Sequence, residues 1–522
     1  MSKRVRTMII ALVAVVALGG GLAAVLLLTD PKDSGADSSD SSTPAISLLD
    51  KSKDKDGKTL EKPVAKVEVQ TGDETFTISD NKDGALSVQT YQDLPIHTDN
   101  VNSLTGALAS ISATRKLDNP QAPSEYGFDK PLGKVNVTYA DGSTYSFEIG
   151  MKSEVSDEAY FRASGSDDIY LVAETFADTV LGKSTKYIGT ALISAPTVKD
   201  DDEEGEPVLR DIELSGSVRE GEPLSVRRVN SNDSETYSLY TYVIEKPFFR
   251  GTGDEAASGA FDSAYSLVAD EAAIAHPTEK QKKDCGFDKP YSVAKMNLAV
   301  ETTEPKNGTT TTTAAGTTGT GEEETVTKYY NVEGHTVTVG KKADGEQYYV
   351  MVNDLDVIYL VSASSIPWLD VTYNDVVTTM LFLQDITGIQ SIAVTENGKE
   401  TRFDMTHDEE AEDSDDALTV KVGGKQLSTA QFRQFYQVLM GVKRIDKADK
   451  TPSGDPDMII RINPISSQDQ TIIAKLYKTS GSRYTCVMQD GDRYQVAAGT
   501  VEAVSKQMAN YLAGKEVLVY EG

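Results

Sequence analysis

The sequence has few of the residues that carry most protein chemistry. Its 522 residues include two cysteines, four histidines and one tryptophan. Cys285 and Cys486 lie in no CxxC or Cys/His pattern, and the histidines show neither H-x3-H nor HExxH spacing, so a zinc site or a Ser-His-Asp triad has no support. Walker A and GxGxxG motifs are also missing. We therefore expect no catalytic, cofactor-binding or metal-binding residues, while a disulfide between the two cysteines stays open.

Basic residues are also scarce relative to acidic ones. The chain has 51 Lys and Arg against 81 Asp and Glu, a formal net charge of −30. Nucleic acids are bound through clusters of basic side chains, so this balance argues against a nucleic-acid partner. An acidic surface is likewise repelled by anionic lipid headgroups, and we expect the body of the protein to stand away from a membrane.

The sequence has one long apolar run. It covers residues 8–28 and contains no charged side chain. At 1.5 Å per residue this run spans about 31 Å, close to the hydrocarbon core of a bilayer. Lys3, Arg4 and Arg6 precede it, so the positive-inside rule predicts a cytoplasmic N-terminus at 1–7 and an extracytoplasmic bulk. A cleaved signal peptide is the alternative, but its apolar region is usually shorter, and we favour a single-pass anchor.

Beyond this segment the sequence predicts a tether at 29–60, rich in Ser, Asp and Lys, and then three similar modules. The modules span 62–195, 205–372 and 386–519, and the third is diverged. The second contains a Thr-rich loop, 302–325, that has no apolar face and is predicted to join two strands of one hairpin.

Each module combines hairpins with helices. In the first, Val135, Val137 and Tyr139 alternate opposite Tyr145, Phe147 and Ile149 across the turn Asp141-Gly142, which predicts a half-buried antiparallel pair. The third has a hairpin at Asn397-Gly398. Helices are predicted at 101–117, capped by Asn100, at 259–275, and at 428–442, where Ser428 begins a cap. Because hairpins join neighbouring strands, the fold class is α+β: an N-terminal transmembrane helix, then three antiparallel sheet-plus-helix modules.

The phrase GFDKP occurs twice, at 127–131 and 286–290. Gly permits positive φ, Phe can fill a core, Asp can hydrogen-bond nearby amides, and Pro sets extended geometry before a strand. No His, Ser or second carboxylate recurs beside both copies, so we interpret the phrase as a structural turn. The third module has Ser453–Asp457 at this place, which keeps Gly and Pro but loses Phe and Lys.

The run YGFDKP, a hairpin ending in Ile-Gly and the stretch YFRASGSDDIYLV resemble the bacterial family of domain of unknown function 4340. The resemblance covers 62–190 and 205–370. It implies a single-pass protein with its bulk outside the cytoplasm, often encoded beside gliding-type ABC transporter subunits. It carries over no catalytic residues.

These observations predict a non-enzymatic, membrane-anchored extracytoplasmic protein. Its expected partner is an integral-membrane protein, such as an ABC transporter permease or its accessory subunit, or the cell wall. An extracytoplasmic ligand-binding protein or an envelope hydrolase is the alternative, and it requires a pocket lined by polar groups from more than one module. An adhesive surface module is a third, weaker reading.

Overall fold

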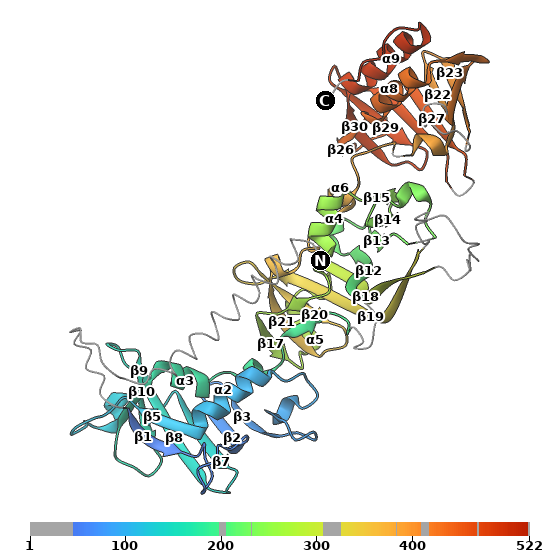
Figure 1. Ribbon diagram of the computed structural model, residues 1–522. Helices are drawn as coiled ribbons and strands as arrows, with labels where there is room; N and C mark the ends of the chain where they lie inside the picture. Colours follow the sequence, from blue (N-terminus) through green and yellow to red (C-terminus); the bar gives the residue numbers. More distant parts are fainter. Residues whose placement is uncertain are drawn as a thin grey trace, which may run out of the picture.

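The computed structural model describes residues 45–197, 205–230, 232–305, 325–382, 384–408, 417–466 and 469–519. Three large antiparallel sheets follow one another along an elongated molecule (Figure 1). This arrangement of antiparallel sheets with a smaller number of helices confirms the α+β class. The predicted membrane span, 8–28, lies outside the described residues, and within them no helix has the length and apolar character needed to cross a bilayer.

The first large sheet runs in the order β4-β3-β2-β7-β8-β9-β10-β6. Its strands are β2 (Val64–Thr71), β3 (Thr75–Asp80), β4 (Leu86–Val88), β6 (Arg115–Lys116), β7 (Gly133–Tyr139), β8 (Thr144–Lys152), β9 (Glu158–Ala163) and β10 (Tyr170–Ala173). Helices α2 (Thr98–Ala109) and α3 (Glu174–Val180) pack on one face, where Leu104 and Val180 join the buried cluster of the sheet.

The second sheet runs β15-β14-β13-β12-β18-β19-β20-β21-β17. Its strands are β12 (Glu206–Ser215), β13 (Leu224–Arg228), β14 (Tyr242–Lys246), β15 (Arg250–Gly251), β17 (Glu271–Ala275), β18 (Ser292–Pro305), β19 (Thr325–Lys342), β20 (Gln347–Val352) and β21 (Val357–Ser362). Helices α4 (Asp254–Phe261), α5 (Glu279–Asp284) and α6 (Tyr373–Val376) belong to the same region. Trp368, the single tryptophan of the chain, is 1% exposed in its core.

The third sheet runs β25-β24-β23-β22-β27-β28-β29-β30-β26. Its strands are β22 (Ile389–Glu396), β23 (Lys399–His407), β24 (Leu418–Val422), β25 (Lys425–Leu427), β26 (Arg444–Lys447), β27 (Met458–Pro464), β28 (Ile472–Lys478), β29 (Arg483–Met488) and β30 (Arg493–Ala497). Helices α8 (Thr429–Met440) and α9 (Ala498–Leu512) cover one face, and Phe403, Phe432, Phe435 and Tyr511 form an aromatic cluster between sheet and helices.

The strand order follows one rule in all three sheets. The first strand of each lies near the middle, the next strands run toward one edge, and a later series of hairpins runs toward the other edge. The outermost strand at that second edge is the one that comes just before this series in the chain, namely β6, β17 or β26. The predicted hairpins are confirmed: Val135 pairs with Phe147 and Val137 with Tyr145, and β22 pairs with β23 across Asn397-Gly398.

Several boundaries differ from the sequence prediction. The helix expected from Asn100 begins at Thr98 after His97 and ends at Ala109, because the alternating segment Ser110–Ala113 forms strand β5. Its partner is β1 (Ile46–Asp50), so the predicted tether 29–60 is wrong for this stretch. The helix expected at 259–275 likewise ends at Phe261, since Glu271–Ala275 pairs with β21. The helix capped by Ser428 is confirmed, with the Ser428 side chain accepting from the backbone N–H of Gln431.

The Thr-rich loop begins later in the chain than predicted. Strands β18 and β19 pair as far as Pro305 and Thr325, so Thr302–Pro305 is strand, and residues 306–324 lie outside the described chain. Residues 198–204 and 409–416, two stretches rich in Asp and Glu, also lie outside it.

Candidate functional site

The two GFDKP phrases form the same helix-ending turn. Gly127 and Gly286 have φ of 80° and 89°, a left-handed conformation that favours glycine. Two backbone hydrogen bonds close each turn: from Gly127 N–H to Ser124 O at 3.1 Å and Phe128 N–H to Pro123 O at 3.2 Å, and from Gly286 N–H to Lys283 O at 2.9 Å and Phe287 N–H to Lys282 O at 3.1 Å. This is the Schellman pattern, in which the residue after glycine packs back on the protein.

The side chains of the phrase support this structural interpretation. Phe128 is 6% exposed and Phe287 is half-buried. Asp129 and Asp288 are exposed and belong to different sheets, so the structure does not bring them together. The predicted hydrogen bonds from backbone amides to these two carboxylates are not formed within the described residues. The backbone path of the turn, rather than a reactive side chain, is therefore what the two copies share.

The first and second sheets meet through paired strands and a common apolar core. Strand β11 (Ala191–Ile193) pairs with β16 (Leu267–Val268). Leu94, Ile188 and Leu192 belong to the buried cluster of the second sheet although they come from the chain segment of the first. His276 lies at the rim of this junction, where its Nε2 is 3.2 Å from Thr90 O and its Nδ1 is 3.4 Å from the Asp356 carboxylate.

A network of charged and aromatic groups crosses the junction between the second and third sheets. Arg250 of β15 lies 2.9 Å from Asp490 and 3.4 Å from Asp492, two carboxylates of the third sheet. The Asp492 side chain is 5% exposed and also accepts a hydrogen bond from the Tyr373 hydroxyl of α6. Arg444 of β26 completes the network, with its guanidinium 5.3 Å from the ring centroids of both Tyr373 and Tyr494.

Burial and opposite charges compete at the centre of this network. Burial raises the pKa of the Asp492 carboxyl above its ordinary value, and the hydrogen bond from Tyr373 and the charges of Arg250 and Arg444 oppose that rise. Burial also raises the pKa of Tyr373 well above its ordinary value, with the Asp492 charge acting in the same direction. The Tyr373 proton therefore stays on its oxygen at neutral pH, which keeps Tyr373 a donor to Asp492.

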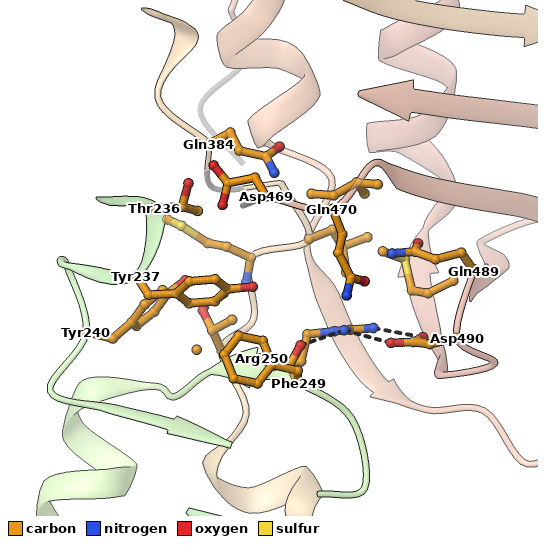
Figure 2. Close-up of a pocket in the computed structure, with 16 residues that line it drawn as sticks. Thr236, Tyr237, Tyr240, Phe249, Arg250, Gln384, Asp469, Gln470, Gln489 and Asp490 are labelled. Carbon is orange, nitrogen blue, oxygen red and sulfur yellow. Dashed lines mark hydrogen bonds and ion pairs between the residues drawn. The ribbon is translucent and has the colours of Figure 1, made fainter. Parts of the chain in front are cut away.

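A cavity of about 170 Å³ opens beside this network, between the second and third sheets (Figure 2). Tyr237, Tyr240 and Phe249 line it from the second sheet region, and the rings of Tyr237 and Phe249 meet edge to face with centroids 4.9 Å apart. Side chains of the third sheet region line the other side, among them Gln384, Asp469, Gln470, Gln489 and Asp490. The cavity thus combines an aromatic wall with a polar wall from a different part of the chain.

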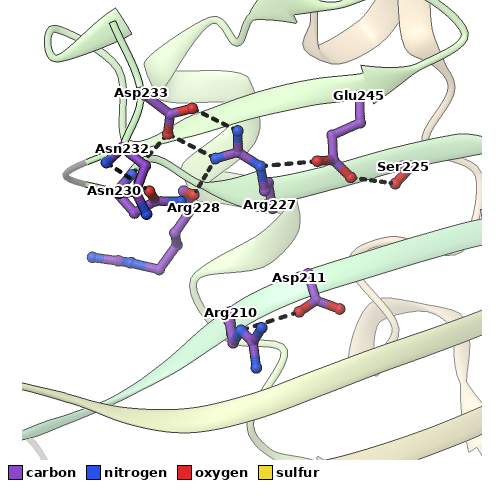
Figure 3. Close-up of polar contacts among 9 residues, drawn as sticks. All are labelled: Arg210, Asp211, Ser225, Arg227, Arg228, Asn230, Asn232, Asp233 and Glu245. Atoms are coloured by element: carbon purple, nitrogen blue, oxygen red, sulfur yellow. Dashed lines mark hydrogen bonds and ion pairs between the residues drawn. The ribbon is translucent and has the colours of Figure 1, made fainter. Parts of the chain in front are cut away.

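A second polar cluster lies on β12–β14 of the second sheet (Figure 3). Its arginines are paired with carboxylates: Arg210 with Asp211, Arg227 with Asp233 and Glu245, and Arg228 with Glu301. Arg227 donates to both Asp233 oxygens, at 2.6 and 2.7 Å. Because each guanidinium has an acidic partner within the same sheet, we interpret the cluster as a stabilising network rather than as an anion-binding surface.

The remaining residues singled out in the sequence have structural surroundings. Cys285 and Cys486 are both free and buried, which answers the open question of a disulfide. Burial raises the pKa of both thiols and makes them poor nucleophiles. The side chain of His335 is only 13% exposed, and burial lowers its pKa. Within the described residues no group of His, Cys, Asp and Glu has metal-binding geometry.

Sequence reasoning missed the residues that form the second junction and its cavity. Arg250, Tyr373 and Asp492 are separated by more than a hundred positions from one another, and nothing in strand periodicity links them. One available signal was the density of aromatic residues between Tyr237 and Phe249, of which only Tyr242 lies in strand β14. Phe249 is accordingly 41% exposed at the cavity.

Comparison with protein families gives one result. The model described as Domain of unknown function (DUF4340) matches residues 87–290 and 279–456, two copies that overlap around the second GFDKP turn. Searches of curated proteins and of solved structures gave no match. The two copies cover well over half of the 522 residues, and the chain belongs to the family of domain of unknown function 4340.

Proposed function

We propose that this chain is a non-enzymatic, membrane-anchored extracytoplasmic protein that holds binding surfaces for an integral-membrane partner. The anchor is the apolar run 8–28, and basic residues before it favour a cytoplasmic N-terminus. The resemblance described above points to an ABC transporter permease or its accessory subunit as the partner, with the cell wall as the other possibility.

We further propose that the three large sheets are copies of one duplicated module. Their common strand order and the matching turns at Gly127 and Gly286 support this origin. The family match in two copies supports it as well. The third sheet keeps the strand order but lacks the Phe and Lys of GFDKP. This is expected of a duplicated module whose side chains have diverged while its backbone path has been kept.

The observation that carries the proposal is the structured contact between successive sheets. A strand pair and a shared apolar core join the first two sheets, and the network around Asp492 joins the last two. An apolar core shared by two domains limits their relative motion, and the ion pairs and hydrogen bonds around Asp492 restrain the second junction. An elongated body with two such junctions suits a protein that presents surfaces at fixed distances from a membrane anchor.

Exposed apolar side chains on the first sheet offer a place for the partner. Leu132 and Met151 are 43% and 41% exposed, and they lie at the same end of the β7–β8 hairpin. Val155, in the loop that follows β8, is 91% exposed. Apolar residues exposed together at one end of a sheet are typical of protein contact sites.

The test is photo-crosslinking of the full chain in native membranes, followed by mass spectrometry. A photoreactive residue at Val155 should recover a permease or its accessory subunit, whereas one at the exposed Ser453 of the third sheet serves as the matched control. Recovery of wall polymers alone from Val155 would reject the membrane-protein partner. Equal recovery from both positions would reject the first sheet as the contact surface.

A ligand-binding protein is the second candidate. The cavity between the second and third sheets favours it, because polar groups from two modules line one space, as this alternative requires.

A further inference from the structure

The cavity between the second and third sheets has the composition of a specific site. Aromatic rings form one wall, and planar amide and carboxyl groups form the other. Figure 2 shows the Tyr237 ring and the Gln470 amide extending into the space from opposite sides, with Gln384 at its upper end. Aromatic faces beside hydrogen-bonding side chains suit a ligand that has one apolar face and polar edges.

The charged groups that line the cavity already have partners. Arg250 is paired with Asp490 at 2.9 Å, and the Asp469 carboxylate accepts a hydrogen bond from Ser234. A cationic ligand would meet the Arg250 guanidinium, and an anionic ligand would meet the Asp469 and Asp490 carboxylates, so a net charge of either sign is repelled by part of the lining. The electrostatics therefore favour a neutral ligand.

Polar groups without a protein partner remain at the same place. Gln384 is 7% exposed, and its Oε1 has no hydrogen-bond partner within the described residues. Buried polar atoms are nearly always paired, so this oxygen is suited to accept a hydrogen bond from a bound molecule once the side chain turns toward the cavity. The Gln489 Oε1 accepts from the Ile473 backbone, which leaves its NH₂ group available as a donor. Both donors and acceptors are thus present.

We propose that this cavity binds a neutral, polyhydroxylated small molecule of about the size of one sugar ring. The space, about 170 Å³, is on the scale of a single sugar ring. The apolar face of the ring packs against the aromatic wall formed by Tyr237, Tyr240 and Phe249. Its hydroxyl groups exchange hydrogen bonds with Gln384 and Gln470.

This proposal is independent of the membrane partner described above and takes up the ligand-binding alternative. Because the walls come from two modules, ligand binding also depends on the junction around Asp492. A failure of crosslinking in membranes would leave the cavity proposal standing, and a failure of ligand binding would leave the partner proposal standing.

The experiment uses the full chain in lipid nanodiscs, since maltoside detergents would themselves compete as sugars. Saturation-transfer NMR and titration measure binding of glucose and N-acetylglucosamine as neutral probes, with glucosamine and glucuronate as charged probes of the same ring size. We expect the neutral sugars to bind and both charged ones to bind more weakly. Gln470→Ala, at an exposed position, should weaken binding about two- to tenfold, as expected for one lost hydrogen bond.

The controls separate loss of the site from loss of the fold. Gln426→Ala changes an exposed glutamine on edge strand β25 and should leave binding unchanged. Tyr237→Phe keeps the ring and should reduce affinity less than Tyr237→Ala, while Trp368 fluorescence verifies folding in every variant. Three results would each overturn the proposal: no binding of either neutral sugar at tens of millimolar, stronger binding of a charged probe, or equal binding by wild type and Gln470→Ala.

Discussion

Replacement of Arg250 by methionine tests whether the second and third sheets form one stable unit. Methionine keeps most of the length of the side chain and removes only the charge and the donors. In the folded protein Arg250 is 17% exposed and faces two carboxylates of the third sheet, at 2.9 and 3.4 Å. The variant leaves Asp492, 5% exposed, with one cationic neighbour fewer.

The magnitude follows from what remains around each carboxylate. Breaking a buried ion pair by removing one partner usually costs about 3–5 kcal/mol. Here Asp490 is 32% exposed and can return to water, and Asp492 keeps the Tyr373 hydroxyl and Arg444. We therefore expect a loss of about 2–4 kcal/mol in the free energy of unfolding.

The single tryptophan makes the measurement specific. Trp368 lies in the core of the second sheet, so its fluorescence reports unfolding of that sheet. With an m-value of about 3 kcal/mol/M, the expected loss lowers the urea midpoint by roughly 0.7–1.3 M. The fluorescence signal arises in the second sheet, and the changed ion pair connects the second sheet to the third. A shift of this size in the urea midpoint therefore reports energetic coupling between the second and third sheets.

The matched control is Arg402→Met. Arg402 forms a 2.7 Å ion pair with Asp404 in which both side chains are about half exposed, and such pairs contribute at most about 1 kcal/mol. A double-mutant cycle of Arg250→Met with Asp492→Asn should give a coupling energy of about 1–3 kcal/mol. If Arg250→Met shifts the midpoint no more than Arg402→Met does, the reasoning about this junction is refuted.

Three further predictions concern single positions. Arg219 is 4% exposed and donates to the Trp368 carbonyl at 2.8 Å and to the Val371 carbonyl at 2.9 Å. Arg219→Met should therefore lower the free energy of unfolding in urea by about 3 kcal/mol or more. A wild-type urea midpoint would contradict this. At Gly286 an added Cβ would lie 2.7 Å from the Lys341 backbone N, whereas Gly454 faces open space at a similar φ. Gly286→Ala should therefore destabilise the protein by about 1–2 kcal/mol more than Gly454→Ala does in thermal unfolding. Equal losses would argue against a close backbone contact at Gly286. The hydrogen bond from Arg227 lowers the pKa of Asp233 below its ordinary value of 3.8, so the ionised carboxylate adds stability above that pH, and this contribution is lost as the pH falls through the lower folded value. Asp233→Asn should therefore cost about 1–3 kcal/mol at pH 7 and reduce the acid dependence of stability below the ordinary pKa, and an unchanged acid profile would oppose this assignment.

Local patterns predicted most of the strands. Alternation of apolar and polar residues located the β7–β8 and β22–β23 hairpins with their register, because one buried face constrains every second residue. The same rule explains the errors. Ser110–Ala113 and Glu271–Ala275 were assigned to helices because small residues such as alanine also favour helix, yet each pairs with a distant strand that local sequence cannot reveal.

The junctions could not be predicted for a related reason. Arg250 meets Asp492 across 242 positions, and their proximity depends on how two sheets pack rather than on any spacing in the chain. The position of the cavity depends on the same packing, since Tyr237 lines it from the second sheet region and Gln470 from the third. The turn at Gly127, in contrast, is local, and its positive φ and structural role were predicted from five residues.

Thiol accessibility in intact cells tests most directly whether the modules lie outside a membrane-anchored N-terminus. The two native cysteines are buried and give a low background. We expect Ser453→Cys, at an exposed position, to react with a membrane-impermeant maleimide in intact cells, and Ser2→Cys to react only after lysis, with the protein remaining in the membrane fraction. Labelling of Ser453→Cys only after lysis, or recovery of the chain in the soluble fraction, would contradict the proposed anchored and outward-facing arrangement.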